Sequence, residues 1–236
     1  MTSMPLFPYL EIMLYLNNVS LKPFQETLLS FSSSSSSPPL SKLKSMHIIG
    51  MEDVVSLPDG WTSNLISLEN LCIFHYKELN LGSDVDRMEW RHLNCLSHLE
   101  FHSLPKLNSL PEALQHVTTL KMLQITLCEN LKTLPQWIWK LISLERLTIY
   151  DCPTLKSLPN EMQDLTSLQR LEIAGCPELR RRCEKQIGQD LHKITHITSG
   201  SIWSAIGIIS LMLTLLQRRL WQKVLEEYLV NLRLVF

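Results

Sequence analysis

Residues 120–135 read LKMLQITLCENLKTLP, and residues 144–159 read LERLTIYDCPTLKSLP, 24 positions later. Counting the first leucine as offset 0, the two stretches share leucine at offsets 0, 3, 11 and 14, isoleucine at 5, cysteine at 8 and proline at 15. Offsets 3 and 5 alternate, so their side chains lie on one face of a short strand. A proline at offset 15 suits a segment outside a sheet. Each copy therefore predicts a strand followed by a return segment.

The same pattern recurs along much of the chain. Four copies in strict 24-residue register begin at Leu96, Leu120, Leu144 and Leu168, and looser copies begin at Leu10, Leu43 and Leu68. One such unit cannot bury its own apolar side, whereas a stack of units can. The pattern is typical of leucine-rich repeats. It predicts an α/β solenoid, a horseshoe with short parallel strands and mostly irregular return arcs.

The repeats and their surroundings suggest two regions. Residues 1–198 form the predicted repeat array of about seven units, with a Ser-rich insert at 31–39 and a C-terminal cap at 180–198. Residues 199–236 are a predicted apolar and amphipathic helical tail. Its apolar run, 202–216, would span about 22 Å as a helix, short of a bilayer core of about 30 Å. Packing on the stack or on a partner, membrane insertion and the absence of a selected role all remain open for it.

Seven repeat positions have a predicted structural role because their side chains turn toward the stack: Leu99, Leu123, Cys128, Leu147, Cys152, Leu171 and Cys176. Cysteine is small, tolerates apolar surroundings and is a weak donor, so it suits a buried turn after the strand. A metal ladder is disfavoured because neighbouring copies lie about 5 Å apart, too far to share tetrahedral thiolates.

Strand residues at offsets 2, 4 and 6 point away from the core and line the predicted concave face. We expect eleven of them to contact a protein ligand: Phe74, His98, Glu100, His102, Gln124, Thr126, Arg146, Thr148, Tyr150, Arg170 and Glu172. Such a mixture of charged and aromatic groups suits protein recognition, although an ordinary solvated sheet face would look similar. His98 and His102 lie roughly 13 Å apart along a strand, too far for one metal ion. No catalytic set and no cofactor motif is apparent.

The net charge and the cysteine content bear on which partners and which compartment the protein can have. The formal net charge is −1, which gives no general attraction to nucleic acid or anionic membranes. The six cysteines include no C-x-x-C pair, and the first residues lack a secretory signal. We therefore expect free thiols in a reducing compartment, the cytoplasm. The basic stretch Arg180–Arg182 with Lys185 is either a solvated cap or a contact for an acidic partner.

Three stretches resemble the repeats of plant intracellular nucleotide-binding, leucine-rich-repeat disease-resistance proteins of the coiled-coil class. They are MPLFPYLEIMLYLNNVSLKP (4–23), PPLSKLKSMHIIGMEDVVSLPDG (38–60) and LTSLQRLEIAGCPELRRRCEKQIGQDLHKITHI (165–197). The resemblance covers about residues 1–198 and implies a non-enzymatic module that recognises a pathogen effector or a modified host protein. In a full receptor it would also restrain a nucleotide-binding domain, in cis or in trans.

The chain lacks the G-x-x-x-x-G-K-[ST] phosphate loop of the family's nucleotide-binding part. We therefore expect a truncated receptor, a fragment of one, or the product of a partial gene model. The alternative function is a substrate adaptor of a ubiquitin ligase or another scaffold protein, built from the same repeats. An adaptor of that kind would need an F-box-like helical segment before the array.

Overall fold

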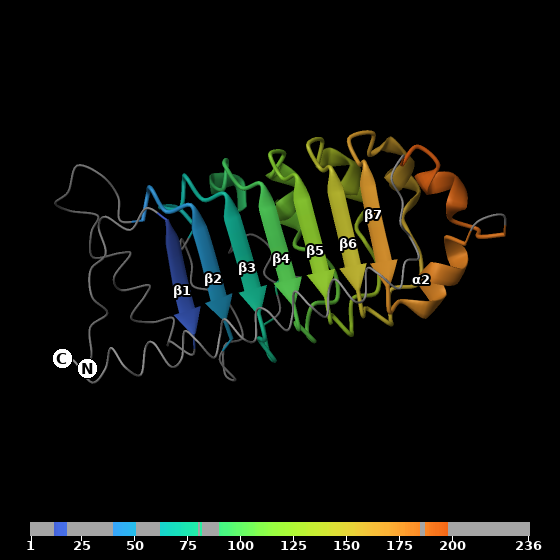
Figure 1. Cartoon of the computed structure of the whole chain (residues 1–236), viewed down its shortest axis with the longest axis horizontal. Coiled ribbons are helices and arrows are strands. Elements are labelled where there is room, and N and C mark those ends of the chain that lie inside the picture. The colour runs from blue at the N-terminus through green and yellow to red at the C-terminus, as the bar shows by residue number, and fades with distance from the viewer. Residues whose placement is uncertain are drawn as a thin grey trace.

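The computed structural model describes residues 12–17, 40–50, 62–79, 81, 90–184 and 187–197. Seven parallel strands lie side by side in chain order in one open sheet (Figure 1). They are β1 (Met13–Asn17), β2 (Ser45–Ile49), β3 (Asn70–Phe74), β4 (His98–His102), β5 (Met122–Thr126), β6 (Arg146–Tyr150) and β7 (Arg170–Ala174). Strand order and direction confirm the predicted solenoid.

The repeat period sets the register of the sheet. Leu123 pairs with Leu147 and Leu147 with Leu171, and the same equivalence holds from β2 to β7. Side chains at the second and fourth strand positions fill the core. Those in β3–β7 are buried to 3% exposure or less: Leu71, Ile73, Leu99, Phe101, Leu123, Ile125, Leu147, Ile149, Leu171 and Ile173. Each strand thus buries one face and leaves the first, third and fifth residues on the other.

The first repeat differs from its prediction by one residue. A start at Leu10 would place Met13 in the core, but Met13 pairs with Ser45 and Leu14 pairs with Met46. Met13 is accordingly 49% exposed and Leu14 only 6%. Four successive apolar residues begin this strand, so alternation does not identify its buried face. A slip of one residue then reverses every side chain.

The return arcs contain short 3-10 helices, which refines the expectation of mostly irregular arcs. They are η2 (Trp90–His92), η3 (Glu112–His116), η4 (Gln136–Lys140) and η5 (Asn160–Asp164). A proline at offset 15 stands directly before η3, η4 and η5, where its missing N–H costs no helical hydrogen bond. Each of these helices contributes a buried side chain to the core: Trp90, Leu114, Ile138 and Met162.

A second buried column lies between each 3-10 helix and the next repeat. Its members are branched aliphatic residues three positions before the start of a repeat: Leu93, Val117, Leu141 and Leu165. Together with the leucines at offsets 0, 11 and 14, these two columns close the space behind the sheet. The core is therefore one continuous apolar cluster along the stack.

The turn after each strand repeats an unusual backbone conformation. The residues that follow β3–β7 have φ between 52° and 67°: His75, Ser103, Leu127, Asp151 and Gly175. The N–H of Leu127 donates to the carbonyl oxygen of Tyr150 at 2.9 Å, and that of Asp151 to Ala174 at 2.9 Å. Only one of the five is glycine, so this hydrogen-bond ladder holds L-residues in a conformation that they rarely adopt.

The cysteines at offset 8 lie directly behind this turn and are fully buried. The Cys152 thiol donates to the carbonyl oxygen of Tyr150 at 3.4 Å, and the Cys152 N–H donates to Cys176 Sγ at 3.4 Å. The hydrogen bond with the Cys128 thiol, together with burial, raises the pKa of Cys152 to about 12. Each thiol thus stabilises the turn of its own repeat and contacts a neighbouring repeat.

A C-terminal cap covers the last repeat. It contains α2 (Pro177–Arg182) and η6 (Leu191–Ile194), which lie beyond β7 in Figure 1. Arg182 forms an ion pair with the buried Asp190, and the more exposed Arg181 pairs with Glu178. Both arginines therefore act within the cap. Lys185 and the tail at 199–236 lie outside the described residues.

Candidate functional site

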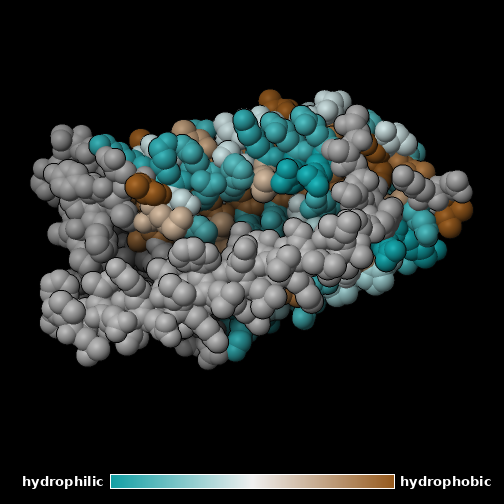
Figure 2. Space-filling model, in the orientation of Figure 1, coloured by the Kyte–Doolittle hydropathy of each residue, from teal (hydrophilic) through white to brown (hydrophobic). Residues whose placement is uncertain are grey.

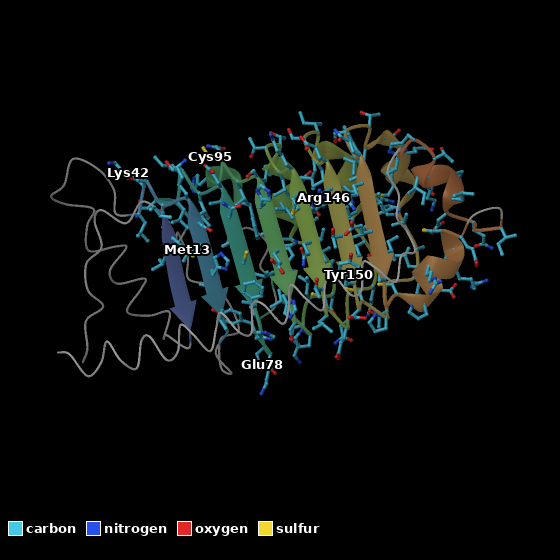
Figure 3. The ribbon with its side chains drawn as sticks, viewed as in Figure 1. Met13, Lys42, Glu78, Cys95, Arg146 and Tyr150 are labelled. Carbon is cyan, nitrogen blue, oxygen red and sulfur yellow. The ribbon has the colours of Figure 1, made fainter. Side chains whose placement is uncertain are left out.

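The structure places all eleven predicted ligand-contacting residues on one side of β3–β7, at the first, third or fifth strand position. We call this side, with its three cross-strand rows, the concave face. Figure 3 shows Arg146 and Tyr150 near opposite ends of β6, so the face spans the whole strand length. In Figure 2, hydrophilic residues predominate in its visible part around β5–β7.

The middle row forms a hydrogen-bonded chain across three strands. The Gln124 side-chain amide donates to Glu100 Oε1 at 3.2 Å, and the Cys72 thiol points to Glu100 Oε2 at 3.8 Å. Gln124 also contacts the Thr126 hydroxyl at 3.5 Å, which links the middle row to the last row. Glu100 is only 6% exposed. A buried carboxylate with these partners is a fixed acceptor rather than a mobile surface charge.

Glu172 connects β6 to β7 at the other end of the face. Its Oε1 lies 2.7 Å from Arg170 Nε, and its Oε2 accepts a 2.9 Å hydrogen bond from the Tyr150 hydroxyl. Burial, followed by this hydrogen bond, raises the pKa of the Tyr150 phenol above its usual value. The phenol therefore stays protonated, and its hydrogen bond to Glu172 fixes the position of the hydroxyl.

Aromatic and imidazole rings gather on β2–β4. The Phe74 ring lies 5.7 Å from the His102 ring and 6.1 Å from the His47 ring, measured between centroids. His75, which follows β3 in the left-handed conformation, packs edge-on against His102 at 5.0 Å. Cys72, Phe74 and Ile49 form a small apolar cluster beside them. This end of the face suits an apolar or aromatic contact.

Two of these rings were not among the predicted site residues. His47 occupies the third position of β2, so applying the offset rule to the looser repeat at Leu43 would have found it. His75 lies outside the strand, and only its positive φ brings it beside His102. Histidine is enriched among the few non-glycine residues with positive φ, but that preference alone is too weak to predict the conformation.

The face is more enclosed than a freely solvated sheet. His98 is exposed, and Gln124, Arg146, Arg170 and Glu172 are half-buried. The remaining predicted residues are at most 8% exposed: Phe74, Glu100, His102, Thr126, Thr148 and Tyr150. In-register parallel strands place equivalent side chains about 5 Å apart, which limits their access to solvent. A partner would thus meet a largely preorganised surface.

The described residues also bear on the hypotheses of a metal site and of a membrane segment. Among the described residues, no group of three His, Cys, Asp or Glu side chains could hold a metal ion. The part of the chain that the structure describes also has no helix with the length and apolar content of a bilayer crossing. The apolar run at 202–216 is outside that part. All six cysteines are free thiols, and Cys95 alone is exposed.

Residues 112–176 match the family model described as R13L1/DRL21 LRRs. The described strands form a leucine-rich-repeat solenoid. A leucine-rich-repeat protein of Leptospira interrogans is similar, with a TM-score of 0.48 and 21% identity over 67% of this chain and 42% of that one. The leucine-rich repeat domain of the type III effector XopL gives a TM-score of 0.44 and 21% identity over 69% of each chain.

The leucine-rich-repeat region matched in the Leptospira protein is thus less than half of that protein's length. A comparison with curated proteins finds no sequence match. A leucine-rich-repeat stack of this kind is a protein-interaction module, in which the repeats supply an extended surface.

Proposed function

We propose that this leucine-rich-repeat solenoid is a non-enzymatic recognition module of plant defence, whose concave face binds a pathogen effector or an altered host protein. The observation that carries the proposal is the concave face of β3–β7. Tyr150, Phe74 and Arg146 belong to residue types that are enriched at protein interfaces, and tyrosine and arginine are among those that dominate binding energy. Each projects from a short strand with a buried opposite face, so its backbone position is fixed before a partner arrives.

The assignment to plant defence draws on two further observations. The stretches at 4–23, 38–60 and 165–197 resemble plant disease-resistance receptors, and residues 112–176 match the R13L1/DRL21 repeats. We extend the proposal accordingly. The module acts in the cytoplasm, and in a complete receptor it restrains a nucleotide-binding domain supplied in cis or in trans.

Site-specific photo-cross-linking tests the proposed face. A benzophenone amino acid replaces Gln124, which is half-buried on the concave face, or Gln115, which is half-buried in η3 on the return arc. Both full-length variants are expressed in plant tissue before and after pathogen challenge and then irradiated. A partner of this face forms its adduct through position 124, and the adduct weakens when Tyr150→Ala is added. Adducts formed equally from both positions, or only from position 115, would remove the concave face as the binding surface.

A further inference from the structure

Arg146 is a cationic side chain of the concave face for which the described residues supply no counter-charge. Arg170 pairs with Glu172, and Glu100 accepts hydrogen bonds from neighbouring strands. Arg146 is half-buried at the first position of β6, yet within the described residues its side chain has no hydrogen bond and no ion pair. A half-buried guanidinium has five N–H donors, and leaving them without an acceptor, as the described residues do here, is costly.

The neighbouring strand increases this cost. Arg146 and Arg170 are in-register partners on β6 and β7, so their Cα atoms are about 5 Å apart and their side chains leave the sheet on the same side. Like charges placed directly opposite destabilise a sheet. Glu172 carries a single negative charge and already pairs with Arg170 through its Oε1, so it cannot neutralise both arginines. Among the described concave positions of β6 and β7, two cations and one anion leave one positive charge uncompensated.

We propose that Arg146, with Arg170 beside it, binds a carboxylate side chain of the protein that the concave face recognises. This inference rests on the function proposed above and specifies the chemistry of the partner. The planar guanidinium matches a carboxylate in a two-bond fork. The single uncompensated charge matches one carboxylate better than a phosphate dianion. On the other side of Arg146, the half-buried Met122 is its in-register partner on β5. The recognised segment therefore presents an aspartate or glutamate next to an apolar residue.

Peptide selection on the full chain tests this chemistry even before the natural partner has been identified. Random displayed peptides are selected on the wild-type protein, and the selected sequences are synthesised and titrated. We expect an acidic residue at one fixed position. Changing it to Gln or Asn in the peptide weakens binding at least about tenfold, as expected for loss of a charge-assisted pair. Arg146→Gln weakens binding equally, and Arg181→Gln, which removes a guanidinium from the cap, leaves it unchanged.

Reversing the charge at position 146 provides a more specific test. Arg146→Glu should bind the lysine version of the selected peptide more tightly than the acidic original. Because the peptide-side change leaves the protein intact, misfolding of an Arg146 variant would not obscure the result. Peptide binding that needs Tyr150 and Gln124 but does not need the acidic residue of the peptide would overturn the carboxylate site. That result would still agree with the concave face as the recognition surface. Peptides insensitive to every concave substitution would overturn both proposals. A phosphoserine version binding about tenfold more tightly than the acidic one would overturn the carboxylate assignment.

Discussion

Asp190 fastens the C-terminal cap to the stack, and its replacement by asparagine should destabilise the protein strongly. Its carboxylate accepts a hydrogen bond from the Leu158 N–H at 3.0 Å and two from the Arg182 guanidinium at 3.1 and 3.0 Å. The Lys193 ammonium lies 2.9 Å from Oδ1 and also donates to the Leu158 carbonyl oxygen at 2.7 Å. Asp190 and Lys193 thus join the cap to the repeat that begins at Leu144.

The expected magnitude follows from burial. The side chain of Asp190 is 1% exposed, that of Lys193 8% and that of Arg182 26%. Removing one partner of a buried ion pair costs about 3–5 kcal/mol, because the other charge stays buried without compensation. Asparagine keeps an oxygen that can still accept the Leu158 N–H, and Arg182 can turn toward water. We therefore expect Asp190→Asn to cost about 3 kcal/mol, near the lower end of that range.

Urea unfolding of the full chain, followed by far-ultraviolet circular dichroism, measures this cost. Amide hydrogen exchange locates it: residues 177–197 should lose protection first, because the end of a solenoid unfolds before its middle. Glu178→Gln is the matched control, since it removes an exposed carboxylate that pairs with Arg181 in the same cap. Equal unfolding midpoints for the two variants, or unchanged exchange at 177–197, would refute the assigned role of Asp190.

Four further outcomes follow from the same structure. Burial alone would raise the pKa of Asp190, but hydrogen bonds from its cationic partners hold that pKa below its usual value. Its stabilising contribution should therefore be complete above about pH 4 and should be lost as the pH falls further. In Asp190→Asn, the free energy of unfolding should depend less on pH in this acidic range. Native thiol labelling at pH 8 should modify Cys95 rapidly and leave Cys152 unreactive until the protein unfolds, because Cys95 is exposed and the pKa of Cys152 is raised to about 12. Leu147→Ala should cost about 2–5 kcal/mol in urea unfolding, because Leu147 is fully buried between two strands. Gly175→Ala should lower the thermal midpoint, because φ is +67° and an added Cβ would lie 1.9 Å from Asp151 Oδ1.

The strands and their order were predictable because the repeat imposes the same local rule several times. Leucine and isoleucine at offsets 3 and 5 recur where two stacked strands need matching buried side chains, and the 24-residue period fixes the register from β4 to β7. The buried residues of the 3-10 helices were not predicted, because no single residue type recurs there. They are Trp90, Leu114, Ile138 and Met162, which differ in size and shape. Their common property is position in the arc rather than residue type.

Other features could not be read from residue types alone. Gly175 carries a clear signal for a left-handed conformation and His75 and Asp151 a weak one, whereas Ser103 and Leu127 carry none. The conformation arises from the hydrogen bond that each turn makes with the next repeat, which is a property of the stack. The rows of the concave face followed from strand alternation, but the diagonal contact from Tyr150 to Glu172 depends on side-chain torsions.

Residue types vary between repeats on the concave face and stay nearly constant on the buried face of the same strands, and both observations have one physical cause. A second or fourth strand position must fit the equivalent side chains of two neighbouring repeats, so leucine, isoleucine or phenylalanine fills it in each of β3–β7. The first position carries no such constraint and varies from Asn70 and His98 through Met122 to the paired Arg146 and Arg170. A pair of like charges is tolerated at this position because the repulsion destabilises only the two strands concerned. A defect in the core would instead disturb the packing of the neighbouring repeats. The positions that are free to bear such a cost are also those that a partner can contact. For this reason a charge at the first position of β6 that the described residues do not compensate is stronger evidence for a ligand than the same charge in a return arc would be.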